Sequence, residues 1–98
     1  MKPEPVSAQA IAVIRDVLQQ DMLRFGMEAI DVRVAPDHTG EPSLWIEVRY
    51  GLGGEPIDPR ATAGLVTKLH DRLWELGEER FPYIRHIVPD DKKVVELT

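Results

Sequence analysis

Two stretches of alternating apolar and polar residues decide the fold: Ile30-Asp31-Val32-Arg33-Val34 and Leu44-Trp45-Ile46-Glu47-Val48-Arg49-Tyr50. Successive side chains of a β-strand point to opposite faces, so each stretch predicts a strand with one apolar face. Between them lies a segment dense in turn-forming residues, Pro36-Asp37-His38-Thr39-Gly40-Glu41-Pro42. We therefore expect an antiparallel hairpin whose polar face carries Asp31, Arg33, Trp45, Glu47 and Arg49.

An amphipathic helix is predicted on each side of this hairpin. The first begins at Ser7, which is placed to cap it, and ends near Phe25 because Gly26 follows. The second begins after Asp58-Pro59 and ends near Leu76, and a glycine-rich stretch, residues 51–57, predicts a flexible connection to it. Apolar residues three and four positions apart form the expected buried faces. They are Ile11, Ile14, Leu18, Met22 and Phe25 in the first helix, and Leu65, Leu69, Leu73 and Leu76 in the second.

Two more strands are predicted after the second helix, from Phe81 to Val88 and from Val94 to Leu97. The order α-β-β-α-β-β predicts an α+β two-layer sandwich: a four-stranded, mainly antiparallel sheet with two helices on one face and the other face open. We expect residues 7–98 to form a single domain and residues 1–6 to form a flexible N-terminal tail. Whether the two similar halves are a duplication is left open by their thin identity.

The composition excludes several classes of protein. The chain has 98 residues, a formal net charge of −5 and no cysteine. Disulfide frameworks, thiol catalysis and cysteine-based metal sites are therefore excluded. The negative charge argues against nucleic acid as a partner, because binding to a phosphate backbone depends on cationic side chains. No apolar run resembles a signal peptide or a membrane span, so we expect a soluble, cytoplasmic protein without a membrane partner.

One pattern suggests metal-dependent chemistry. Pro36-Asp37 followed by Glu47-Val48-Arg49 resembles the Pro-Asp…(Asp/Glu)-x-Lys site of a large nuclease superfamily, in which two carboxylates hold magnesium. Arg49 stands where that site has lysine, and an arginine does not give up its proton to activate water. The three histidines have no local metal-ligand spacing, and no nucleophile motif is present. We therefore predict no catalytic residue, metal ligand or cofactor, and keep a divalent-metal nuclease as an alternative.

The stretch from Arg80 to His86 combines arginine, aromatic and histidine side chains in seven residues. Arginine and aromatic residues are enriched in binding interfaces. The competing interpretation is structural: Phe81 and Tyr83 pack at the end of the sheet, while Arg80 and Arg85 pair with neighbouring glutamates. Both interpretations place a charged, aromatic segment on or beside the sheet.

Trp45 is expected on the open face, because its neighbours Leu44 and Ile46 belong to the core face. An arginine of an adjacent strand would cover the indole, or a partner would. Our hypothesis is a small non-enzymatic protein-binding or regulatory module that uses the open sheet face or a sheet edge, with another protein or a second copy as partner. An RNA-binding or ribosome-associated module is the other alternative. The candidate binding residues are Arg33, Trp45, Arg49, Arg80, Tyr83, Arg85 and His86.

Overall fold

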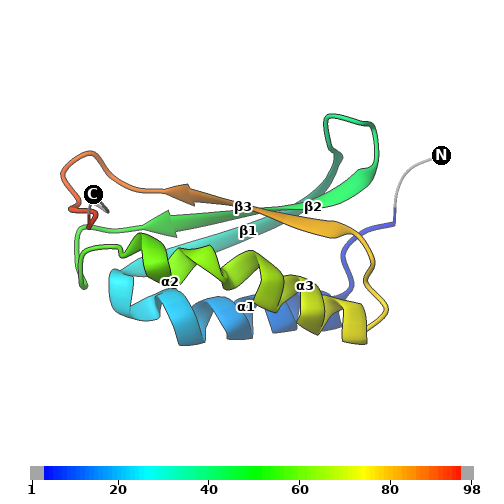
Figure 1. Cartoon of the computed structure of the whole chain (residues 1–98), viewed down its shortest axis with the longest axis horizontal. Coiled ribbons are helices and arrows are strands. Elements are labelled where there is room, and N and C mark those ends of the chain that lie inside the picture. The colour runs from blue at the N-terminus through cyan, green and yellow to red at the C-terminus, as the bar shows by residue number, and fades with distance from the viewer. Residues whose placement is uncertain (1–3, 96–98) are drawn as a thin grey trace.

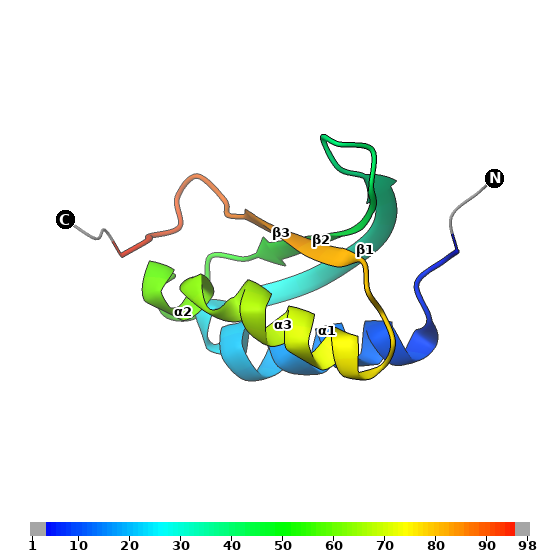
Figure 2. The same cartoon turned by 45° about the vertical axis from the view of Figure 1, so that its right-hand side comes forward.

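The computed structural model describes residues 4–95, which form an α+β fold with helices packed on one face of a three-stranded sheet (Figure 1). Figures 1 and 2 show α1 and α3 side by side beneath the sheet, and residues 4–95 place no helix on the opposite face. Within residues 4–95, none of the helices is long and apolar enough to cross a membrane. In chain order the elements are α1 (Ala8–Met22), a 3-10 turn η1 (Leu23–Phe25), β1 (Met27–Pro36), β2 (Pro42–Tyr50), α2 (Pro59–Ala63), α3 (Leu65–Glu75) and β3 (Phe81–Ile87).

The strands lie in the order β1-β2-β3. β1 and β2 form the predicted antiparallel hairpin, with Val32 opposite Ile46, whereas β3 pairs with β2 in parallel. The prediction of a four-stranded, mainly antiparallel sheet is therefore wrong for the described residues, which form a three-stranded mixed sheet. The reason is that the connection through α2 and α3 returns the chain to the starting end of β2, and a strand that follows such a crossover runs parallel.

The predicted fourth strand does not join the sheet in the described part of the chain. Val94 forms an isolated parallel bridge with Ile57, and Leu97 lies outside the described residues. Two hydrogen bonds direct the segment away from the sheet edge, one from Val95 N to the Ile57 carbonyl (2.7 Å) and one from the Lys92 ammonium to the Gly53 carbonyl. The similarity of the two halves therefore stops before the second hairpin.

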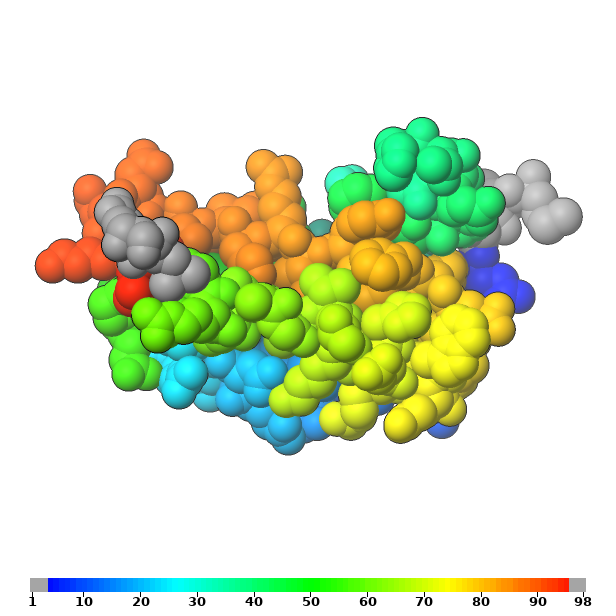
Figure 3. Space-filling view, in the orientation of Figure 1, coloured from blue at the N-terminus to red at the C-terminus, as the bar shows by residue number. Residues whose placement is uncertain are grey.

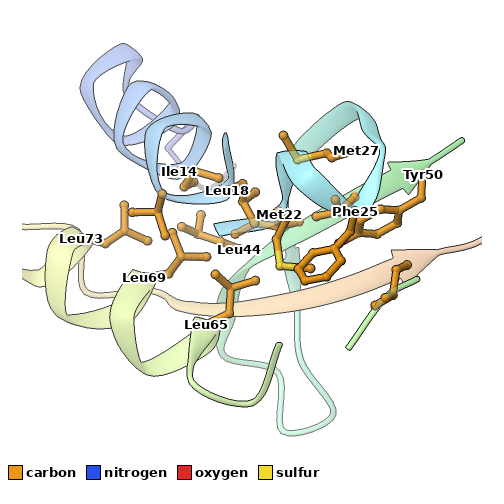
Figure 4. Close-up of a cluster of buried hydrophobic side chains, with 14 of the residues drawn as sticks. Ile14, Leu18, Met22, Phe25, Met27, Leu44, Tyr50, Leu65, Leu69 and Leu73 are labelled. Carbon is orange, nitrogen blue, oxygen red and sulfur yellow. The ribbon is translucent and has the colours of Figure 1, made fainter. Parts of the chain in front are cut away.

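A hydrophobic core fills the space between the helices and the sheet (Figure 4). Ser7 caps α1 by accepting a hydrogen bond from Ala10 N at 3.1 Å, and Gly26 ends the helical segment with a φ of 86°. Most of the predicted apolar faces are buried. The fully or nearly fully buried members include Ile14, Leu18, Met22, Leu44, Ile46, Val48, Leu65, Leu69 and Leu73.

The second predicted helix differs from the expectation in two respects. Gly64 divides it into α2 and α3, as expected for the non-proline residue with the lowest helix propensity. Leu76, which we expected in the core, is 44% exposed. It is the C-cap residue of α3, one position beyond the last helical residue, so the 3.6-residue period no longer aims its side chain at the sheet.

Candidate functional site

The register of the sheet arranges the side chains of the open face in rows that run across all three strands. Arg33 of β1 lies opposite Trp45 of β2, and Trp45 lies beside Tyr83 of β3. The next row is charged. It consists of Asp31, Glu47 and Arg85. Four of the seven predicted binding residues are therefore brought together at the centre of this face.

Trp45 and Tyr83 form a stacked pair. Their ring centroids are 4.7 Å apart and their planes are inclined by 18°. The Trp45 indole donates a hydrogen bond to the Ala35 carbonyl at 3.1 Å, and the Tyr83 hydroxyl lies 3.5 Å from a carboxylate oxygen of Asp37. Trp45 is thus covered on one side by Tyr83, whereas we expected either an arginine of an adjacent strand or a partner, and both rings stay half-buried. A rigid pair of rings at the protein surface provides a large apolar contact area.

The stacked pair lies in a pocket of about 370 Å³ that extends across the sheet. The pocket reaches from β1 over the two rings to the outer edge of β3, where Ile84 and Val66 of α3 complete its lining. In the space-filling view the turn between β1 and β2 rises above the level of the sheet at one end (Figure 3). The remaining polar lining residues are Asp31, Arg33, Glu47 and Arg85.

The arginines of this face differ in their pairing. Arg49 donates two hydrogen bonds to Glu47, at 2.8 and 3.0 Å, and so neutralises that carboxylate. Neither Arg33 nor Arg85 makes an ion pair with any group in residues 4–95, and both are exposed. A guanidinium offers five N–H donors and binds carboxylates in a forked geometry. Two such groups therefore remain available beside the aromatic pair.

Arg80, another predicted binding residue, has a structural role. Its guanidinium binds both oxygens of Glu78, at 2.9 and 2.7 Å, and donates to the carbonyls of Glu4 and Pro5. The hydrogen bonds from Arg80 lower the pKa of the Glu78 carboxyl below its ordinary value. For Arg80 the alternative interpretation, pairing with a neighbouring glutamate, is confirmed, and the pair ties the N-terminal segment to the start of β3. Arg85 has no such glutamate partner within residues 4–95.

His86 lies on the helix side of β3 and not on the open face. Its Nδ1 is 2.7 Å from the Tyr50 hydroxyl. Burial lowers the pKa of His86 and raises the pKa of Tyr50 to about 12. The imidazole is therefore neutral and the tyrosine protonated at physiological pH, and the tautomer of His86 sets which of the two groups donates. This pair is inside the sandwich, so His86 does not belong to the surface formed by Trp45 and Tyr83.

The residues of the nuclease-like pattern are held separately. One oxygen of Asp37 accepts hydrogen bonds from the backbone and hydroxyl of Thr39 and from Glu41 N, at 2.7 to 3.1 Å, within its own turn. The Thr39 hydroxyl is the main reason that the pKa of Asp37 is lowered. Glu47 is paired with Arg49. In the stretch from residue 4 to residue 95, no group of three or more His, Cys, Asp or Glu side chains is arranged to hold a metal ion.

The aromatic surface continues around the edge of β3 onto α3, which sequence reasoning missed. Phe81 contacts Tyr83 at a centroid distance of 4.9 Å and His70 at 5.7 Å, and His70 contacts Trp74 at 5.8 Å. His70 and Trp74 are four residues apart on one face of α3, as are Val66 and His70. The sequence pattern that indicates this second face of α3 is the spacing of four residues beside the buried leucines of the same helix.

No protein-family model, curated protein or solved structure matches this chain. The residues themselves, their contacts and their exposure therefore provide the basis for a functional proposal.

Proposed function

We propose that this protein is a protein-binding module that holds an extended segment of a partner against the open face of its sheet. The observation that carries the proposal is the stacked Trp45–Tyr83 pair, which lies in one pocket with two arginines that are unpaired within residues 4–95. Tryptophan, tyrosine and arginine are the residue types that contribute most to binding energy in protein interfaces. Here they meet at the centre of a face that is covered by none of the helices in the described part of the chain.

The chemistry of the pocket favours a segment with an apolar side chain next to an acidic one. The apolar side chain would pack on the rings of Trp45 and Tyr83. A carboxylate would accept hydrogen bonds from Arg33 or Arg85, which lie on the outer strands at either side of this pair. Asp31 limits how many negative charges the segment can carry, since it lines the same pocket. The expected ligand is therefore a peptide of mixed character and not a polyanion.

The same features argue against single-stranded RNA as the ligand. An RNA-binding sheet stacks successive bases on free aromatic faces and neutralises several phosphates. Trp45 and Tyr83 already stack on each other, and Glu47 and Asp31 line the pocket. The chain also carries a formal charge of −5. A peptide segment fits this mixture of charges better than a phosphate backbone does.

Selection from a peptide library displayed on phage tests the proposal. We expect wild-type protein to enrich peptides that combine an aromatic or aliphatic residue with a nearby Asp or Glu. The double variant Arg33→Glu/Arg85→Glu is expected to bind the enriched peptides at least tenfold more weakly in a fluorescence anisotropy titration, because each lost charge-assisted hydrogen bond is worth about 1.5–3 kcal/mol. Both residues are exposed, so the variant keeps the core intact.

The matched control is Arg15→Glu, which reverses an exposed charge on α1, away from the open face. It should leave peptide affinity within twofold of the wild-type value. Enriched peptides that bind the double variant and wild type equally would overturn the proposal. So would tighter binding to a labelled single-stranded oligonucleotide than to every selected peptide, because that result would favour the RNA alternative.

A further inference from the structure

The outer edge of β3 is unpaired in the described part of the chain, because β3 is the last strand in the order β1-β2-β3. Proline has no N–H and is tolerated inside a paired strand only where that position faces the free edge. Pro82 therefore indicates that the backbone groups of the even-numbered residues point outward. The edge offers the N–H groups of Ile84 and His86 and the carbonyls of Pro82, Ile84 and His86. Such a row of donors and acceptors is a template for another strand.

An exposed apolar strip runs along this edge. Its exposed members are Phe81, which is 43% exposed, and Trp74 on the adjoining face of α3, which is 55% exposed, and next to them on α3 lie the half-buried Val66 and His70. Phe81 and His70 are in contact, so strand and helix contribute to one continuous surface. In Figure 3, β3 and the yellow-green α3 face the viewer along most of their length without another segment in front of them. Exposed aromatic side chains that form one contiguous surface are typical of interaction sites.

We propose that a second copy of this chain occupies this edge, with the two β3 strands pairing antiparallel about a twofold axis at Ile84. The product is a six-stranded sheet in the order β1-β2-β3-β3′-β2′-β1′. The twofold axis is perpendicular to the sheet, so both open faces remain on one side and all helices on the other. This proposal does not depend on the peptide-binding function, although Tyr83 and Arg85 of the open-face pocket take part in both.

The side chains of β3 are complementary to themselves in this register. On the open face, Phe81 lies opposite Ile87 of the partner subunit, and Tyr83 lies opposite Arg85 of the partner subunit. These are an apolar pair and a cation–π pair, and both kinds stabilise neighbouring strands. On the helix side Ile84 meets its own copy. Val66 of α3 lies near Ile84 in the lining of the same pocket.

Other antiparallel registers are less favourable. An axis at Arg85 places this arginine opposite its own copy, and two like charges directly opposite each other destabilise a sheet. An axis at Tyr83 pairs only residues 81–85 with one another, whereas the axis at Ile84 pairs the whole strand, Phe81–Ile87. The charge pattern and the length of the strand therefore select the same register.

The other edge of the sheet is less suited to this pairing. β1 carries a bulge between Met27 and Ala29, and bulges are a device by which proteins protect sheet edges. Val32 and Val34 of β1 also line a pocket together with residues 4–6 of the N-terminal segment. In the described residues, β3 has no bulge in its pairing with β2, and none of its residues lines that pocket with the N-terminal segment. Pairing there also gives each open-face pocket a residue of the other copy, because the partner's Arg85 reaches Tyr83.

Cysteine cross-linking tests the register directly, because the natural chain contains no cysteine. In the proposed dimer Phe81 and the partner's Ile87 form a non-hydrogen-bonded pair, with Cα atoms about 4.5 Å apart, which is within disulfide range. A mixture of Phe81→Cys and Ile87→Cys chains should yield a covalent dimer under mild oxidation. A mixture of Phe81→Cys and Arg85→Cys chains should not. If the second mixture cross-links and the first does not, the axis is at Tyr83 and the proposed register is wrong.

Sedimentation equilibrium tests the association itself. Wild-type protein should approach twice the chain mass of 11.1 kDa as its concentration rises. Phe81→Lys and Ile87→Glu should each weaken dimerisation at least tenfold, because each buries a charge opposite an apolar residue. Mixed together they should recover a dimer, since the introduced lysine and the introduced glutamate then form one ion pair and the other pair stays native. A monomer at all concentrations up to 0.5 mM, or no recovery in the mixture, would overturn the proposal while leaving the peptide-binding test unaffected.

Discussion

Tyr50 and His86 form a polar pair within the sandwich, and the environment of each group sets its protonation state. Burial lowers the pKa of His86 from the ordinary value of 6.5, so the folded protein keeps the imidazole neutral at a pH where the unfolded chain begins to protonate it. Between the folded and unfolded pKa values the unfolded state binds more protons, and the free energy of unfolding therefore rises with pH.

We predict that the stability supported by His86 is complete above pH 6.5 and decreases as the pH falls from there toward the lowered pKa of the folded state. The measurement is the free energy of unfolding from urea titrations between pH 5 and pH 7.5. The variant His86→Gln keeps an amide that can pair with the Tyr50 hydroxyl but does not titrate. Its stability should therefore decline less over this range than that of wild type. Equal declines would show that His86 does not contribute to the pH dependence.

At this scale the sequence placed Trp45 correctly on the open face, whereas it left open which face carries His86. Trp45 lies on the open face because Leu44 and Ile46 are both buried, a relation that alternation alone predicts. The same alternation separates Tyr83 and Arg85 from His86, but it does not say which set faces the helices. The Arg80–Glu78 pair shows the other limit, because local spacing allows the pairing and only the fold shows that it holds the N-terminal segment.

Among the elements, the glycine-rich connection after β2 differs most from its predicted character. We interpreted it as a flexible linker, yet it is a close-packed junction. Gly51 N donates to the Gly26 carbonyl at 2.9 Å, and Glu55 N donates to the Arg24 carbonyl at 2.8 Å. A Cβ atom on Gly54 would lie 2.6 Å from Gly26 N. Glycine is suited both to a mobile loop and to a junction where two backbone segments pack closely. The composition of residues 51–57 therefore does not distinguish a flexible linker from a packed junction.

Gly54→Ala should therefore destabilise the protein more than Gly40→Ala. Both glycines have a positive φ, of 82° and 88°, so both variants lose about 1–2 kcal/mol from the left-handed backbone. Only Gly54 adds a backbone collision, because a Cβ on Gly40 meets nothing within 4 Å. We expect a further loss of about 1–3 kcal/mol for Gly54→Ala in urea denaturation, similar to overpacking a core. Equal losses would show that the junction relaxes freely.

Apart from the predicted fourth strand, the elements themselves were predicted well, whereas their pairing was not. Periodicity located both helices and the three strands, because amphipathic spacing is a local property of the chain. It does not encode which strand lies beside which or in what direction. The parallel placement of β3 depends on the packing of Leu65, Leu69 and Leu73 against the sheet, and that packing is a long-range property.

At the scale of the whole molecule, Lys92 connects the C-terminal segment to the rest of the fold. It is only 9% exposed, and its ammonium donates to the Gly53 carbonyl. Lys92→Met keeps the aliphatic length of the side chain and removes the donor. We expect it to lower the free energy of unfolding by about 1–3 kcal/mol, because a carbonyl at a packed junction loses a charged donor.

Lys93→Met is the matched control, since Lys93 is the exposed neighbour. Its effect should stay within about 0.5 kcal/mol, as for most surface substitutions. Urea titrations of both variants give the comparison. If the two variants are equally stable, the contact between Lys92 and Gly53 does not secure the C-terminal segment.

The parallel pairing of β2 and β3 also determines when the open face becomes complete during folding. The β1–β2 hairpin closes a short loop, whereas β3 reaches β2 only after the chain from Gly51 to Arg80 has returned across the sheet. Closing the longer loop loses more chain entropy, so we predict that β3 docks after the hairpin has formed. A chain caught before that step displays Trp45 without Tyr83. A partner that requires both rings would therefore bind the folded protein but not an intermediate in which β3 has not yet paired with β2.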